Sequence, residues 1–252
     1  LHGTVLAIPV VNVPGFTVGD RYLADRRDLN RSFPGSPRGS LASRIAHALM
    51  TDVVSTADFG IDLHTGSDHR TNLPQIRANL DDARTRELAD AFGPPVMLHA
   101  AIRDGSLRQS AAEQGCAVLL YEAGEAWRFD EDAIRVGTSG CLRVLSHAGM
   151  TPDLDAPETG PAPMVSHSSR WARARRSGIA QIWSVSGEVV AKGQTVGRIH
   201  DAFGAKLSDI KANETGLVIG HSLDPIVNQG DAVVHIASID PTDSPTEPEV
   251  RS

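Results

Sequence analysis

The sequence predicts an α/β domain followed by a small all-β module. In the first half, short apolar runs typical of buried strands alternate with segments of helical periodicity. From about Ser177 the chain changes to short β-like runs separated by glycines. With 252 residues, 40% of them hydrophobic, the chain is long enough for one sizeable domain and a small one. We therefore expect helices layered around a buried sheet, and a β module after them.

The elements of the first half follow from these patterns. Strands are expected at residues 4–11, 59–63 and 116–121. Apolar residues recur at helical spacing elsewhere, and helices are expected around 41–49 and at 81–92, 106–114 and 130–148. Gly137 and Gly140 weaken the last of these helices.

Composition sets the boundaries between the parts. Residues 151–163 hold four prolines and little apolar content, which indicates a connection rather than a packed element. The end of the chain, SIDPTDSPTEPEVRS, is rich in proline and acidic residues and is expected to be disordered. We assign 1–150 to the α/β domain, 151–168 to a linker, 169–238 to the β module and 239–252 to a disordered tail.

The β module contains an internal repeat. Residues 189–196 and 226–233 share the pattern V-x-x-G-[QD]-x-V, which indicates two quasi-equivalent hairpin halves. The repeat resembles the barrel-sandwich module of biotinyl and lipoyl carriers. A carrier needs a modifiable lysine, and Lys206 and Lys211 lie between the halves, but neither has a methionine beside it. A structural module that shields an active-site mouth or forms an oligomer contact is the favoured interpretation.

Charge and cysteine content exclude several kinds of partner. A net charge of −7 gives no electrostatic footprint for nucleic acid. The sequence contains no apolar stretch of about 18 residues that could span a membrane. Cys116 and Cys141 are far apart and are interpreted as buried thiols, which favours a reducing cytoplasm.

Three short motifs carry the residues that could perform chemistry: DLNRSFPG at 28–35, IDLHTG at 61–66 and YEAGE at 121–125. His64 ends an apolar run, so its imidazole should lie at a strand end, as a metal ligand or as a hydrogen-bonded structural residue. Asn30 and Arg31 suit an anionic substrate, although Arg31 could also be a surface residue. Arg21, Arg26 and Arg27 are also basic and nearby, and they cannot be distinguished from solvated charges.

A carboxylate also follows a buried run in this pattern. Glu122 comes directly after CAVLLY, and burial of a carboxylate requires a partner. It could be a general base or a salt-bridged glutamate, and Glu125 is the competing base. Ser106 is a candidate N-cap of the preceding helix.

These motifs resemble those of the succinylglutamate desuccinylase/aspartoacylase family, the deacylase branch of the zinc carboxypeptidase-like enzymes, from residue 1 to about Ala237. The resemblance implies a mixed sheet flanked by helices with a C-terminal barrel-sandwich module. It makes His64 the third ligand of one zinc ion and Glu122 the general base that deprotonates a zinc-activated water and then protonates the leaving amine. Asn30, Arg31 and, more loosely, Arg108 would bind substrate, and Asp28 would orient a histidine of the family's first zinc motif.

That first motif, His-x-x-Glu, does not occur in the sequence. After His2, the position of its glutamate is occupied by Val5, so we expect the two further zinc ligands upstream of residue 1. This chain alone should then bind zinc weakly and be inactive. The predicted function is hydrolysis of the amide bond of an N-acyl amino acid, with a possible homo-oligomer. The alternatives are a zinc carboxypeptidase and a catalytically silent binding or structural protein.

Overall fold

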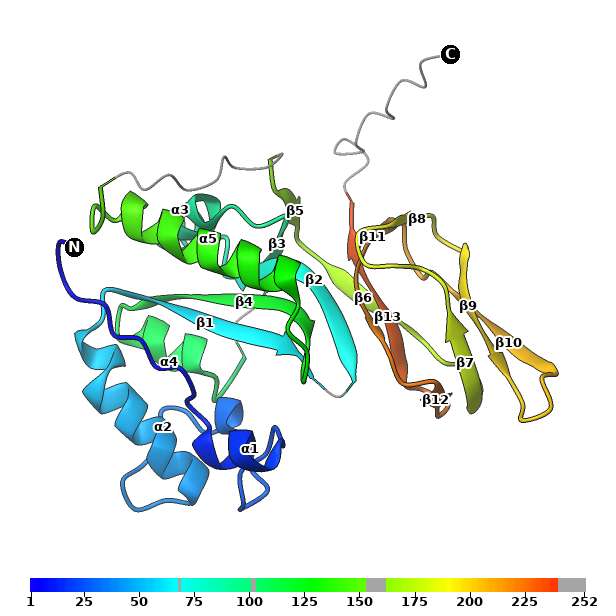
Figure 1. Ribbon diagram of the computed structural model, residues 1–252, viewed down its shortest axis with the longest axis horizontal. Helices are drawn as coiled ribbons and strands as arrows, with labels where there is room; N and C mark the ends of the chain where they lie inside the picture. The colour runs from blue at the N-terminus through cyan, green and yellow to red at the C-terminus, as the bar shows by residue number, and fades with distance from the viewer. Residues whose placement is uncertain (68, 101–102, 153–161, 240–252) are drawn as a thin grey trace, which may run out of the picture.

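The computed structural model describes residues 1–67, 69–100, 103–152 and 162–239. These residues form a nine-stranded mixed sheet and a smaller four-stranded sheet, with the helices gathered on the two faces of one half of the large sheet (Figure 1). The first half contains α1 (Val13–Val18), η1 (Leu29–Arg31), α2 (Leu41–Asp52), η2 (Val54–Thr56), β1 (Phe59–Gly66), β2 (Arg70–Ala78), α3 (Ala83–Phe92), β3 (Val96–His99), α4 (Leu107–Glu113), β4 (Ala117–Glu125) and α5 (Glu131–His147). The second half contains β5 (Met164–Ser166), β6 (Ser169–Arg173), β7 (Gly178–Ile182), β8 (Val189–Val190), β9 (Thr195–His200), β10 (Lys206–Lys211), β11 (Gly216–Ser222), β12 (Ile226–Val227) and β13 (Ala232–Ser238).

The predicted mixed sheet with helices on both faces is confirmed. β1 and β4 run parallel, whereas β2 pairs antiparallel with β4 and parallel with β3. Helices α3 and α5 cover one face, where Phe92 and Tyr121 pack with the core of the sheet. On the other face, α2 and α4 pack with Cys116 and Val118 at the start of β4.

Helix α5 is continuous through the two glycines that weaken its prediction. Asp130 caps its N-terminus by accepting a hydrogen bond from the backbone N–H of Ala133. A Cβ at Gly140 would lie 2.3 Å from the ring of Phe92, and one at Gly137 would lie 2.9 Å from that of Tyr121. These positions therefore let the helix approach two aromatic rings closely, which offsets the low helix propensity of glycine.

The strand expected at residues 4–11 does not form, and that prediction is wrong. The segment runs outside the sheet to α1 (Figure 1), and several of its apolar side chains are exposed, Leu6 by 58%. Strand propensity is expressed only when a neighbouring strand takes up the backbone hydrogen bonds, and β1, the nearest strand in sequence, pairs with β4.

The β module is joined directly to the helical half. β11 pairs antiparallel with β2 on one side and with β13 on the other, so the large sheet continues from one half into the other. The second sheet, in the order β10-β9-β7-β12, faces this part of the large sheet across a core of small and branched apolar side chains. The C-terminal β module expected from the sequence is present.

The segment between the halves differs from the prediction. Met164–Ser166, within the expected linker 151–168, forms β5 and pairs with β3. Short apolar segments can join a sheet where an edge strand offers free hydrogen-bonding groups, as β3 does here. Residues 153–161 and the expected tail beyond Ile239 lie outside the described residues.

The internal repeat corresponds to two turns of the same geometry. Gly193 and Gly230 have φ values of +88° and +97°, which only glycine adopts without strain. In one turn the side chain of Gln194 accepts from the N–H of Ala191; in the other, Asp231 accepts from the N–H of Asn228. The repeat therefore encodes two equivalent turns. Each turn joins strands of different sheets, β8 to β9 and β12 to β13, and these strands do not pair with each other, so the predicted hairpin halves do not form.

A buried histidine in this module makes the fold sensitive to acid. Burial, aided by the charges of Arg77 and Arg70, lowers the pKa of His235 to about 3, and its ring stacks on Trp171 at 4.4 Å. The unfolded chain takes up this proton near the ordinary value of about 6.5, so stability is present above that pH and is lost as pH falls.

Because of His235, we expect the free energy of unfolding to fall by about 2.5 kcal/mol between pH 7 and pH 4.5. Urea unfolding at both pH values measures this loss. His235→Phe, which keeps a ring against Trp171 but cannot be protonated, should show a smaller loss. An equal acid dependence in both proteins would assign the effect to other groups.

Candidate active site

The large sheet places His64 and Glu122 side by side. In the parallel register of β1 and β4, His64 is the direct partner of Glu122. Side chains alternate along a strand, so Asp62 and His64 project to one face of β1. Val118 and Glu122 project likewise from β4, on the face where Val118 packs with α2 and α4. A candidate metal ligand and a candidate base therefore meet on the same face.

His64 is held by a carboxylate. Its Nε2 lies 2.9 Å from Oδ2 of Asp62, and both side chains are mostly buried. Burial alone lowers the pKa of His64, but the hydrogen bond and charge of Asp62, together with the charge of Glu122, outweigh burial and raise the pKa. A metal-ligating histidine commonly has one ring nitrogen bonded to a carboxylate in this way, which fixes the other nitrogen toward the metal.

Glu122 is held from the strand on its other side. Its Oε2 accepts a hydrogen bond of 2.9 Å from Nδ2 of Asn72 and lies 3.5 Å from Nε of Arg77. Both partners come from β2, which the sequence did not predict as a strand. The carboxylate is thus partly buried beside a cation and an amide, as a positioned base requires.

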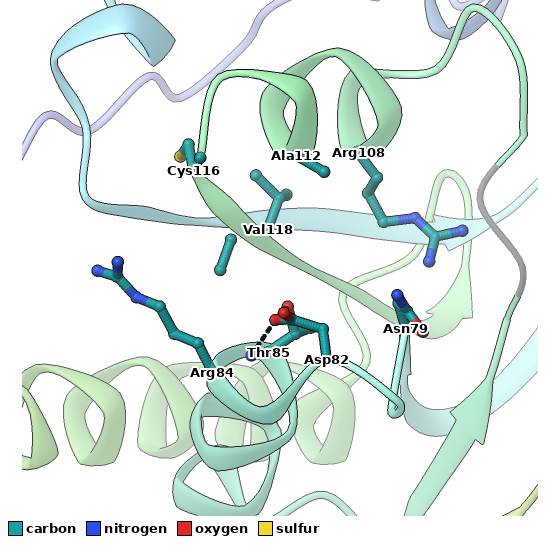
Figure 2. A pocket seen from close by; sticks show the side chains of 10 residues that line it. Asn79, Asp82, Arg84, Thr85, Arg108, Ala112, Cys116 and Val118 are labelled. Atoms are coloured by element: carbon teal, nitrogen blue, oxygen red, sulfur yellow. Dashed lines mark hydrogen bonds between the residues drawn. The ribbon is translucent and has the colours of Figure 1, made fainter.

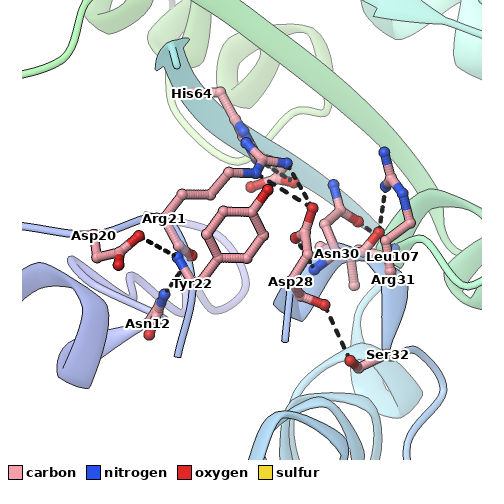
Figure 3. A network of polar contacts seen from close by, with 11 residues as sticks. Asn12, Asp20, Arg21, Tyr22, Asp28, Asn30, Arg31, Ser32, His64 and Leu107 are labelled. Carbon is pink, nitrogen blue, oxygen red and sulfur yellow. Dashed lines mark hydrogen bonds and ion pairs between the residues drawn. The ribbon is translucent and has the colours of Figure 1, made fainter. Parts of the chain in front are cut away.

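The loop that carries Asn30 is ordered by its own carboxylate. Asp28 forms an ion pair of 2.9 Å with Arg21 and accepts from the N–H of Asn30 (Figure 3). Asn30 in turn accepts a 3.0 Å hydrogen bond from the N–H of Leu107, which begins α4. Because Oδ1 of Asn30 is occupied by this bond, its Nδ2 is the side-chain atom that can donate a hydrogen bond to a substrate. The role of Asp28 toward a histidine remains a prediction.

The two predicted substrate arginines lie in different surroundings. Arg31 is exposed, and its guanidinium donates to the carbonyl of Asn30 beside it. Arg108 points inward from α4 and donates to the carbonyl of Arg77 at 3.3 Å. Burial and the charge of Arg77 lower the pKa of Arg108, while Glu122 and Asp62 act in the opposite direction. Arg108, the looser of the two assignments, is therefore the one beside the base.

Comparison with known proteins identifies the family. The model of the succinylglutamate desuccinylase/aspartoacylase catalytic domain matches residues 1–148, more than half of the chain. The chain belongs to this family. The sequence resemblance drawn from the three motifs is thereby confirmed.

Similar proteins cover nearly the whole chain. N-alpha-acetyl-L-2,4-diaminobutyric acid deacetylase of Halomonas elongata is 26% identical over 95% of this chain and 73% of its own length. The crystal structure of a succinylglutamate desuccinylase/aspartoacylase from Rhodobacter sphaeroides superposes with a TM-score of 0.81 at 29% identity, covering 92% of this chain and 74% of that one. The product-bound ectoine utilization protein EutE (DoeB) of Ruegeria pomeroyi shares the fold, with a TM-score of 0.83 at 24% identity over the same shares.

The described residues contain one candidate metal ligand, His64. They contain no group of three histidine, cysteine, aspartate or glutamate side chains that could hold a metal ion. His64, with its imidazole bonded to Asp62, has the arrangement of one zinc ligand, and it fits a zinc site to that extent.

No helix among the described residues is long and apolar enough to cross a membrane.

A small cavity has Arg108 in its lining. It has a volume of about 180 Å³ and opens between α4, β4 and the start of α3, with Arg108 and Arg84 at its two sides (Figure 2). Cys116 lies at its wall as a free, buried thiol whose pKa is raised by burial. Asp82 in this cavity is already bonded to Thr85 and caps α3.

Four residues of this site were given no role from the sequence: Asp62, Arg21, Asn72 and Arg77. Asp62 stands two residues before His64 in the motif IDLHTG, so this spacing could have assigned it to His64. Arg21 was noticed but could not be separated from its neighbours. Asn72 and Arg77 gave no signal, because they act from a strand interrupted by Pro74 and rich in polar residues.

Proposed function

We propose that this chain is the catalytic part of an enzyme that hydrolyses the amide bond of an N-acyl amino acid. The observation that carries the proposal is the register of β1 and β4, which sets His64 directly beside Glu122 in a chain of this family. The named Halomonas relative, a deacetylase of an N-acetylated amino acid, supports the same class of substrate.

In this proposal His64 holds zinc together with ligands that the described residues do not provide. Zinc, when bound, supplies Lewis-acid polarisation of the amide carbonyl and makes a water acidic at neutral pH. Glu122 takes a proton from the attacking water and transfers it to the leaving amine. Asp62 keeps the imidazole of His64 in one orientation, and Asn72 and Arg77 keep the carboxylate of Glu122 in place.

The substrate's carboxylate is assigned to Asn30 and Arg31. The guanidinium of Arg31 is a planar fork that matches a carboxylate, and Nδ2 of Asn30 is available beside it. Arg108, half-buried and close enough to Glu122 for their charges to interact, is placed to stabilise negative charge that develops on the carbonyl oxygen.

A matched pair of substrates tests these two roles. Arg31→Lys keeps the charge but loses the bidentate geometry. On an N-acyl amino acid kcat/KM should therefore fall roughly thirtyfold, which corresponds to about 2 kcal/mol of activation free energy. On the analogue with a neutral amide in place of the carboxylate, Arg31→Lys should be nearly equal to wild type. Arg108→Lys should lose activity on both substrates. If Arg31→Lys loses activity equally on both substrates, Arg31 does not bind the substrate's carboxylate.

A further inference from the structure

The carboxylate of Glu122 is fixed through one of its two oxygens. Asn72 donates to Oε2 at 2.9 Å, and Nε of Arg77 lies 3.5 Å from the same atom. Oε1 is therefore the oxygen left for the attacking water. The orientation of the Glu122 carboxylate therefore depends on the position of the side-chain amide of Asn72.

Asn72 is itself placed by the C-terminal module. It is 8% exposed, and its backbone pairs with Gly124 of β4 on one side and with Gly220 of β11 on the other. A Cβ at Gly220 would lie 2.6 Å from Oδ1 of Asn72 and 2.7 Å from the carbonyl oxygen of Thr71. Real Cβ atoms do not approach so closely, so the amide of Asn72 occupies space that only a glycine leaves open.

The contact between β2 and β11 is made along several residues. The side chain of Gln75 donates to the carbonyl of Ile219 at 3.2 Å in the buried interior, and the N–H of Leu223 donates to the carbonyl of His69 at 2.7 Å. β11 is also bonded to β13, the central strand of the module within the large sheet. A displacement of β11 therefore moves β2.

We propose that the C-terminal β module positions the general base: Gly220 leaves the space that fixes Asn72, and Asn72 fixes the carboxylate of Glu122. The inference rests on the proposed function, because it gives Glu122 the role of base. Asn72 is a positioning residue that acts through Glu122. The module then contributes to catalysis from β11 and does more than shield the mouth of the site.

The first test is Asn72→Asp in the natural protein with its metal. The change keeps the shape of the side chain but replaces the donor with a carboxylate that repels Oε2 of Glu122. We expect kcat to fall at least about tenfold with KM changed less than about twofold. Asn79→Asp, one residue beyond the end of β2, is the matched control and should keep wild-type kinetics. A raised KM with unchanged kcat would assign Asn72 to substrate binding and overturn the proposal.

The second test separates the module's role from general destabilisation. Gly220→Ala crowds Asn72, whereas Gly197→Ala crowds Gln181 and Ile210 inside the module, where a Cβ would lie 2.8 Å from the carbonyl oxygen of Gln181. Both variants should lower the thermal midpoint, but only Gly220→Ala should lower kcat. Equal kcat in the two variants would overturn the proposal, and if Gly220→Ala does not fold, Asn72→Asp decides.

Glu122→Gln distinguishes failure of this inference from failure of the proposed function. Loss of activity in Glu122→Gln, with none in Asn72→Asp, overturns the positioning role alone. Full activity in Glu122→Gln overturns the proposed function itself. Loss in both, with KM preserved in Asn72→Asp, is the result that we expect.

Discussion

Glu122→Gln in the natural protein is expected to lower kcat by roughly a hundredfold or more. Glutamine keeps the size of the side chain and can still contact Asn72 and Arg77, but it cannot accept a proton from water. Steady-state kinetics on an N-acyl amino acid measures the change, with zinc content determined on the same sample to show that the metal is retained.

Glu125→Gln is the matched control for this prediction. Glu125 lies three residues further along β4 and forms an ion pair of 2.8 Å with the exposed Arg128. That contact occupies the carboxylate at the surface, and we expect its loss to change kcat little. Retained activity in Glu122→Gln with loss in Glu125→Gln would transfer the role of base to Glu125.

His64→Ala is expected to abolish stoichiometric zinc binding and, with it, activity. A catalytic zinc site commonly has three protein ligands, and loss of one opens the site and releases the metal. Metal analysis of dialysed protein gives the zinc content of each variant. His47→Ala, on α2, is the control and should retain zinc.

Asp62→Asn should weaken zinc binding, but less than His64→Ala does. It keeps the shape of Asp62 but removes the charge that orients His64 through the 2.9 Å contact. Loss of such a partner lowers metal affinity roughly 10- to 100-fold.

Full zinc occupancy in His64→Ala would show that His64 is a structural histidine.

The sequence predicted the elements in which local pattern and tertiary environment agree. α2, α3, α4 and α5 were predicted from their apolar periodicity, and the cap at Ser106 is present. β4 begins with a continuous apolar run that is mostly buried between helices, as is typical of a central strand, and the shorter apolar run of β1 predicted its neighbour. The repeat with Gly193 and Gly230 was readable because both turns need positive φ.

The rest depends on pairing that local sequence does not reveal. Residues 4–11 have strand composition without a strand partner, whereas β2 is polar and contains Pro74 yet lies between β4 and β11. Its position in the sheet outweighs its composition. Because Asn72 and Arg77 reach Glu122 only through that position, no spacing along the chain could have assigned them.

Motif and geometry contributed differently to the site. His64 and Glu122 were named from motifs 58 residues apart (122 minus 64), and the parallel register brings them together. Arg108 was the weakest assignment from sequence, yet it donates to the carbonyl of Arg77 and senses the charge of Glu122. Arg31 had the more specific motif and lies exposed.

We propose that the protein cleaves the amide of N-acyl amino acids. The most direct measurement is release of free amino acid by the natural, zinc-loaded protein from two matched sets of compounds: N-acetyl and N-succinyl amino acids, and dipeptides with the same C-terminal residue. We predict hydrolysis of at least one N-acyl amino acid and no comparable release from the dipeptides. Release from dipeptides alone would identify a carboxypeptidase, and turnover of neither set by protein with full zinc content would contradict the assignment to an N-acyl amino acid deacylase.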